Sequence, residues 1–453
     1  MEITLLAAYA ALILWTGFSS GKRSVAAFFV NNRESGALGV GFSIIVSCVG
    51  ASATIGTIGM AFSVGTPALW WLGAGAAGLT VLSVFLAGKV RQSGAYTLPH
   101  MVETYLGLSV RPVISLVIVV AWSAILAAQF SALTRVLEPL TGFSPLLCLG
   151  VGFLLICGHS IGGQSAIMRV DRVQALILIL ALAAILVWLD WRNPDWTAAV
   201  DFQLVNAGFP PEKLLYFLVI VGANYVVCPM LFGRMLSARD ERSAKLGGLV
   251  GAVGILACSG LIVAVGLACR GLIPAGTPED AVLTTVLAEA MPRWLHIVVS
   301  FALISAIVSS ADSCLVTAAT VCSYDLLGRQ DVASGRRCIL ALGAAGALVS
   351  LWGKGILGFL LMAYDIFACG VVMPVFVGLL LRGRAMDSRW AGAAVGIGGL
   401  LGLASAVTGE TLFSYTGIAV SSILALCGAY VGGRGRDVNA SGGRGSAPDP
   451  ARG

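Results

Sequence analysis

The sequence predicts an all-α membrane protein with about thirteen transmembrane helices. Hydrophobic residues make up 58% of the 453 positions and charged residues only 11%, and the mean hydropathy is +0.93. A soluble domain of this length would carry roughly a quarter charged residues to wet its surface. Apolar runs instead recur along the whole chain, each long enough to cross about 30 Å of hydrocarbon. Because lipid offers the backbone no hydrogen-bond partner, these runs are expected to be helical.

The apolar runs define the expected spans. They cover residues 3–20, 37–64, 67–88, 109–135, 144–163, 170–189, 213–232, 246–269, 294–324, 338–353, 355–381, 390–408 and 412–432. In the first of them the basic residues Lys22 and Arg23 follow the apolar stretch instead of preceding it. It is therefore interpreted as an uncleaved anchor and not as a signal peptide.

The distribution of basic residues predicts the orientation. With residue 1 outside, 22 of the 28 Lys and Arg residues fall on the cytoplasmic side, Arg234 among them, and six fall outside. Cytoplasmic loops are enriched in Lys and Arg. We expect a bacterial inner (plasma) membrane protein with its N-terminus outside and its C-terminus in the cytoplasm. Residues 433–453 are rich in Gly, Ser and Pro and are predicted to be a disordered cytoplasmic tail.

Several classes of function are disfavoured. The eleven cysteines are scattered and form no C-x-x-C, and His100, His159 and His296 lie far apart, so neither a zinc site nor a disulfide framework is indicated. No soluble catalytic domain remains once the spans are subtracted, which argues against an enzyme. The expected partners are the lipid bilayer and a small-molecule solute. Nucleic acid is not an expected partner, and no obligate protein partner is implied.

Two of the spans contain features that interrupt a helix. The second contains GFSIIVSCVGASATIGTIGMAF, rich in glycine, and the seventh contains GANYVVCPMLFGR, in which Pro229 removes a backbone hydrogen bond. Small residues on one helix alone would indicate close helix packing. Two interrupted helices five spans apart are typical of inverted-repeat transporters, in which they meet at the binding site. The repeats would cover about 37–189 and 213–381 within one transporter domain, residues 1–432.

The ninth span carries a dense row of oxygen atoms in AIVSSADSCLVTAATVCSYDLLGR. A small hard cation takes about six oxygen ligands, which hydroxyls and free backbone carbonyls can supply. An unwound helix facing the Ser309–Ser310 pair could therefore bind Na⁺. The alternative is hydrogen bonding between helices by the same hydroxyls.

Five motifs in order resemble the sodium:solute symporter family between about residues 25 and 385. They are FFVNNRESG with the broken helix after it, SGAYTLPHMVETYLG, RVDRVQA, FGRMLSARDERSAKLG and SSADSCLVTAATVCSYDLL. The resemblance implies the leucine-transporter fold, a 5+5 inverted repeat with one extra N-terminal and two extra C-terminal helices. It also implies secondary active transport by alternating access, as Na⁺-coupled symport of a small polar organic solute such as an amino acid or a carboxylate.

The resemblance also implies site residues. The family's Na⁺ site falls here on Ala51 and Thr54 in the second span and on Ala306, Ser309 and Ser310 in the ninth. A second cation, present in some members, would use Asp171 opposite Asp312 and Ser313. Asp171 could equally form a salt bridge with Arg169 or Arg172 at the cytoplasmic interface.

The solute pocket most resembles the sodium/proline permease branch, through TRVLEPLTG, Tyr225 and Pro229. Three branch positions differ, because they fall here on Ile125, Val221 and Ala53. Gln129, Asn224 and Tyr225 remain as polar groups that could orient a solute.

Asp365 is also assigned to solute binding, because an acid in the middle of a span is costly and commonly functional. A structural hydrogen-bonded carboxyl is the alternative. Two other functions stay open: a proton-coupled carrier that uses Asp365 or Asp171, and a transporter-like solute sensor.

Overall fold

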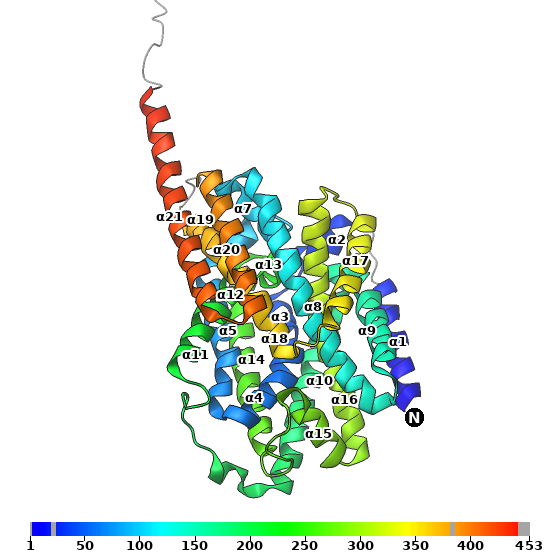
Figure 1. The fold of residues 1–453 in the computed structure, drawn as a ribbon. Helices are drawn as coiled ribbons and strands as arrows, with labels where there is room; N and C mark the ends of the chain where they lie inside the picture. The colour runs from blue at the N-terminus through cyan, green and yellow to red at the C-terminus, as the bar shows by residue number, and fades with distance from the viewer. Residues whose placement is uncertain (1, 20–23, 381–385, 443–453) are drawn as a thin grey trace, which may run out of the picture.

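The computed structural model describes residues 2–19, 24–380 and 386–442, and these residues form helices and no β-strand. The long helices run side by side in one bundle (Figure 1). Their bounds are α1 Glu2–Ser19, α2 Val25–Val30, α3 Ala37–Cys48, α4 Thr57–Val64, α5 Trp70–Val81, α6 Ala87–Gln92, α7 Leu98–Leu106, α8 Arg111–Thr141, α9 Pro145–Ser160, α10 Gly163–Arg192, α11 Pro211–Tyr216, α12 Ala223–Val227, α13 Pro229–Leu236, α14 Glu241–Ala268, α15 Val282–Glu289, α16 Arg293–Val321, α17 Val332–Ser350, α18 Ile356–Phe367, α19 Met373–Leu380, α20 Ser388–Thr408 and α21 Thr411–Gly442.

Ten helical segments in the described ranges are long and apolar enough to cross a membrane. The bent pair α3 and Ser52–Val64 raises this to eleven if it is counted as one span. The two remaining predicted spans, 3–20 and 144–163, correspond to the shorter apolar helices Glu2–Phe18 and Pro145–Ser160. The all-helical membrane fold is confirmed, while the count of thirteen stays a prediction.

The first helix break lies between α3 and α4. Val49 leaves helical geometry with φ −94° and ψ 57°, and the chain turns by 64° before the π-helical turn η2, Ser52–Gly56. Gly50 at this break lies against α16, where a Cβ atom would come within 2.2 Å of the Ser310 hydroxyl oxygen. Only a residue without a side chain allows so close an approach.

The second break lies between α12 and α13. Cys228 has ψ 120°, far from helical, and Pro229 starts the new helix. Proline is tolerated at a first helical position because the N–H it lacks would have no partner there. The seventh predicted span is thus interrupted at Cys228, but it is not bent by more than 40° as the second span is.

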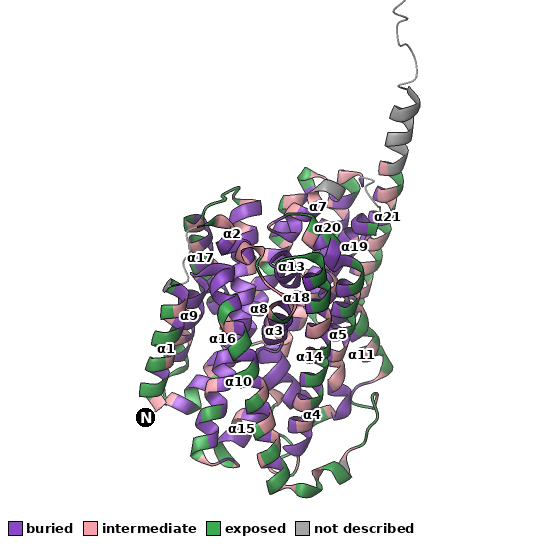
Figure 2. Ribbon diagram, turned by 180° about the vertical axis from the view of Figure 1, so that it is seen from behind, coloured by how far each residue is buried: buried purple, intermediate pink, exposed green. Residues whose placement is uncertain are grey.

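α16 lies at the centre of the bundle. In its most apolar window 83% of the residues are buried, compared with 28% for the span Thr411–Gly432 at the edge. Figure 2 shows the same contrast, with α16 and α8 mostly buried and with many exposed and intermediate residues on α1 and on the coloured part of α21. The hydroxyl-rich helix predicted to bind cations is therefore surrounded by protein.

Two charged residues are more deeply placed than their positions in the sequence indicate. α10 begins at Gly163, before the predicted start at residue 170, and Asp171 is fully buried within it. Arg234 was counted with the cytoplasmic loop residues, but it lies inside α13 and only 1% of its surface is exposed. The sequence does not show this burial, because it depends on which helices pack around the residue; the side of the membrane to which Arg234 is nearer stays a prediction.

The start of α1 and the end of α21 lie at opposite ends of the bundle (Figure 1), as an odd number of spans requires. Which end faces the cytoplasm stays a prediction. α21 is helical as far as Gly442, which is inside the segment predicted to be a disordered tail. Residues 443–453 of that segment lie outside the described residues.

Candidate functional site

The first break and α16 meet at Ser310. Its hydroxyl donates to the carbonyl oxygens of Val46 and Ser47, both at 3.0 Å, at the C-terminal end of α3. Those carbonyls are among the last of a helix and lack partners within it. The hydroxyl of Thr54 donates to the carbonyl of Gly50 at 2.8 Å and so holds the far side of the break. The break is thus lined by backbone and hydroxyl oxygens.

The five residues assigned to Na⁺ are all buried: Ala51, Thr54, Ala306 and Ser309 have no exposed surface and Ser310 has 1%. Ala51 follows Gly50 directly, at the point where the chain touches Ser310. Ala306 lies one turn before Ser310 on α16, so both share a helix face. We call these five residues the first position. Each is neutral, so its oxygens could solvate a cation without a carboxylate.

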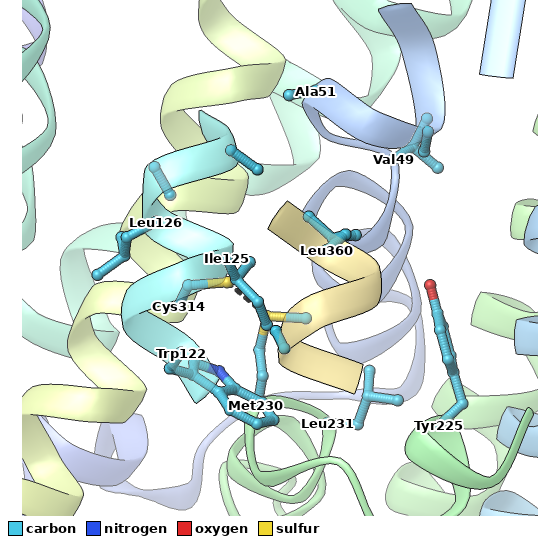
Figure 3. Close-up of a cluster of buried hydrophobic side chains, with 14 of the residues drawn as sticks. Val49, Ala51, Trp122, Ile125, Leu126, Tyr225, Met230, Leu231, Cys314 and Leu360 are labelled. Atoms are coloured by element: carbon cyan, nitrogen blue, oxygen red, sulfur yellow. Dashed lines mark hydrogen bonds between the residues drawn. The ribbon is translucent and has the colours of Figure 1, made fainter. Parts of the chain in front are cut away.

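A hollow lies beside the first position, between the two helix breaks. Its cavity volume is about 40 Å³. Its lining includes Ser47, Gly50, Ser52, Trp122, Ile125, Gln129, Asn224, Tyr225, Cys228, Met230, Ser310, Leu360 and Tyr364. Figure 3 shows Trp122 and Ile125 of α8, Met230 and Leu231 of α13 and Leu360 of α18 gathered there, with Tyr225 nearby. We call this space the central pocket.

Three predicted solute-binding residues, Gln129, Asn224 and Tyr225, line the central pocket. The Gln129 Oε1 atom accepts the backbone N–H of Ala51 at 3.2 Å, so this side chain touches both the pocket and the first break. The Asn224 Oδ1 and Trp122 Nε1 atoms are buried and have no hydrogen-bond partner. A buried polar atom without a partner is costly, and a bound polar solute could supply one.

The other two predicted solute-binding residues lie elsewhere. Pro229 lines a neighbouring hollow together with Tyr96, Gly233 and Thr317. Asp365 lines a third hollow, where its Oδ1 atom accepts from the hydroxyls of Tyr216 and Ser414, each at 2.7 Å. Their roles in solute binding stay predictions.

The residues assigned to a second cation, which we call the second position, form contacts on the adjacent turn of α16. Asp171 accepts the Ser309 hydroxyl at 2.9 Å and also the hydroxyl of Ser43. The Oδ2 atom of Asp171 lies 3.6 Å from the Nη2 atom of Arg234 on α13. The salt bridge of Asp171 is therefore formed with Arg234, whereas Arg169 or Arg172 was the predicted partner. A contact between Arg234 and Asp171 was not predicted, because the two residues belong to different predicted repeats.

Asp312 has a different set of partners. One carboxylate oxygen accepts the Ser160 hydroxyl at 2.7 Å, and the other is bonded to the Nδ1 atom of His159. His159 has no exposed surface. The sequence analysis weighed the histidines only against metal-binding spacings and so missed this pair. Among the residues that the structure describes, no group of three or more His, Cys, Asp or Glu side chains could hold a metal ion.

Comparisons with known proteins agree with this geometry. The model of the sodium:solute symporter family matches residues 28–189, which include the first break, Gln129 and Asp171. The sodium/pantothenate symporter of Haemophilus influenzae is 23% identical over 71% of this chain and 70% of its own length. That of Escherichia coli is 24% identical over 92% of each chain.

These matches support the predicted resemblance to the sodium:solute symporter family. The matched family and relatives are transporters, in agreement with the prediction that the chain is not an enzyme. Both relatives are named for pantothenate, whereas the motifs of the solute pocket resembled the sodium/proline permease branch.

Solved structures establish the fold of this chain. A Na⁺-coupled sialic acid symporter in a substrate-bound outward-open state aligns with TM-score 0.80 and 15% identity, over 95% of this chain and 98% of the other. The nucleobase-cation-symport-1 family transporter MHP1 aligns with TM-score 0.65 and 14% identity, over 89% and 94%. MhsT in complex with L-phenylalanine aligns with TM-score 0.54 and 15% identity, over 88% and 99%. The predicted leucine-transporter fold is confirmed.

Proposed function

We propose that this symporter carries a small polar organic solute through the central pocket and couples its movement to Na⁺ bound at the first position. The observation that carries the proposal is the meeting of a broken helix with the Ser309–Ser310 pair of α16 beside that pocket. Broken helices at a midpoint site are how transporters of this architecture expose backbone carbonyls to an ion.

The chemistry of the first position suits Na⁺ better than a proton. Its side-chain ligands are hydroxyls, which do not change protonation in the physiological range. Na⁺ is a hard cation that takes hydroxyl and carbonyl oxygens without needing a carboxylate. A proton-coupled carrier would instead need a titrating group at the pocket, and none of the described residues lining the central pocket is an acid or a histidine.

The central pocket favours a solute held by neutral hydrogen bonds. Gln129, Asn224 and the unpartnered Trp122 N–H offer donors and acceptors, and the remaining lining is largely apolar. A solute carboxylate would have to take its counter-charge from the bound Na⁺. The two curated relatives are named for pantothenate, a hydroxylated amide with one carboxylate, and this makes pantothenate the first solute to test.

The test is uptake of radiolabelled pantothenate into proteoliposomes that contain the purified protein. An inward Na⁺ gradient should drive accumulation, whereas equal K⁺ or an inward proton gradient should not. Competition by unlabelled amino acids, carboxylates and pantothenate analogues would then define the solute class. If pantothenate is not taken up, a thermal-shift screen of metabolites in Na⁺ and in K⁺ identifies a solute that binds only with Na⁺. Accumulation driven by a proton gradient without Na⁺ would refute the proposal.

A further inference from the structure

The second position holds a side-chain cation of the protein itself, the guanidinium of Arg234. Arg234 is 1% exposed, and its Nη2 atom donates to the hydroxyl oxygens of Ser313 at 2.5 Å and Ser47 at 2.8 Å. The same atom lies 3.6 Å from the Oδ2 atom of Asp171. These contacts come from α10, α16 and α3, so the guanidinium lies where three helices meet.

The oxygens that a second Na⁺ would use already have partners. Arg234 bonds Ser313 and faces Asp171, while His159 and Ser160 bond the two oxygens of Asp312. Asp171 further accepts from Ser43 and Ser309. A sodium ion here would have to displace hydrogen bonds that the protein makes internally.

The charge of Arg234 also disfavours a sodium ion beside Asp171. A buried carboxylate needs a positive partner, since an isolated buried charge is strongly unfavourable. Arg234 supplies that partner permanently, because a guanidinium does not lose its proton in proteins. A Na⁺ ion bound to Asp171 would lie beside this fixed charge in a medium that screens poorly, and the two cations would repel each other.

We infer that Arg234 is a tethered cation that takes the place of a second Na⁺, so that this symporter binds one Na⁺ ion per chain, at the first position. The inference rests on the proposed function, since it presupposes Na⁺ binding at that position. Arg234 follows the second helix break, on α13, so its charge is carried by one of the two broken helices. Asp171 is then a counter-ion for the protein and not a ligand of the coupling ion.

The inference is tested by equilibrium binding of ²²Na⁺ to the purified full-length protein, with K⁺ holding the ionic strength constant. One Na⁺ per chain is expected. Two ions per chain in the wild-type protein would overturn the inference whatever the variants do. No Na⁺ binding at all would instead refute the proposed function, so the two failures are distinguishable.

Variants of Arg234 test whether this residue sets the number of Na⁺ ions bound per chain. Arg234→Ala removes the tethered cation and opens space beside Asp171, and this variant should bind two Na⁺ ions. Arg234→Ala combined with Asp171→Asn removes the carboxylate as well and should return to one, as should Arg234→Lys, which keeps the charge. Arg239→Ala is the matched control, because Arg239 is an exposed arginine close by in sequence that pairs with Asp240. An Arg234→Ala protein that folds and still binds one ion would contradict the inference.

Discussion

The two positions on α16 differ in how their charge is balanced. The first has no formal charge, a helix break that exposes carbonyls, and hydroxyls from Ser309 and Ser310. The second, one turn further along, has two carboxylates, yet both are bonded to cationic or titratable side chains of the protein. A richer set of oxygens therefore does not identify an ion site. What matters is whether the protein has already supplied the cation.

The largest effect on stability is expected when one charge of the Asp171–Arg234 pair is removed. Asp171→Asn leaves a buried guanidinium without a counter-charge, and breaking a buried ion pair in this way typically costs about 3–5 kcal/mol of unfolding free energy. The midpoint of thermal unfolding in detergent should fall markedly. Asp171→Asn with Arg234→Met removes both charges and should recover much of the loss. If the Asp171→Asn variant were as stable as the wild type, Asp171 would not be the carboxylate that balances the buried charge of Arg234.

The His159–Asp312 contact should have a smaller effect. His159→Ala leaves the Asp312 carboxylate short of one donor, and an unsatisfied buried group costs about 1–3 kcal/mol. His159→Asn places a side-chain N–H close to the original Nδ1 atom and should be nearer to the wild type in thermal stability. Equal destabilisation by Ala and Asn would mean that packing, and not the hydrogen bond, is what His159 provides.

Gln129 connects the first break with the central pocket. Gln129→Leu removes the acceptor of the Ala51 N–H and a polar group facing the solute. We expect the solute KM for uptake at saturating Na⁺ to rise about tenfold, which corresponds to about 1.4 kcal/mol. Gln174→Leu is the control: Gln174 is a buried glutamine on α10 that contacts the Ser305 carbonyl and does not line the pocket. If Gln174→Leu raised the solute KM as much as Gln129→Leu, the effect could not be assigned to the position of Gln129 in the central pocket.

Asp365 should have the smallest effect. It lies outside the central pocket and accepts hydroxyls from Tyr216, Ser405 and Ser414. Asp365→Asn keeps a carbonyl acceptor of the same shape, so we expect the solute KM to change less than about threefold, well under the 1.4 kcal/mol of a tenfold shift. A tenfold increase at unchanged stability would return Asp365 to the solute site that its position in the sequence predicted.

The sequence predicted the broken helices because glycine and proline act locally. GASATIG and Cys228–Pro229 interrupt their helices whatever the neighbouring helices are, and the structure has both interruptions at those residues. Gln129, Asn224 and Tyr225, which were predicted to orient a solute, line one hollow together, and their role in solute binding stays a prediction. The fold and the family followed from hydropathy and motif order.

The partners of buried charges could not be predicted in this way. Arg234 lies near the end of a span and has the same local pattern as a cytoplasmic arginine, whereas its contacts with Asp171 and Ser313 depend on how α13 packs against α10 and α16. His159 meets Asp312 across 153 positions of sequence. The surroundings of Asp365 could not be predicted either, because depth in a span does not tell whether an acid faces the central pocket or the hydroxyls of Tyr216, Ser405 and Ser414.

The most direct test of the first position is a Na⁺ titration of thermal stability in the wild type, Ser310→Ala and Ser305→Ala, with K⁺ replacing Na⁺. Ser310 is preferred to Ser309, since the Ser309 hydroxyl also donates to Asp171. Hydrogen bonds to charged groups contribute about 1.5–3 kcal/mol, so loss of one hydroxyl ligand should raise the Na⁺ concentration for half-maximal stabilisation at least tenfold. Ser305→Ala, on the same helix outside the position, should match the wild type. Unchanged Na⁺ dependence in Ser310→Ala, or stabilisation by K⁺ equal to that by Na⁺, would contradict the assignment.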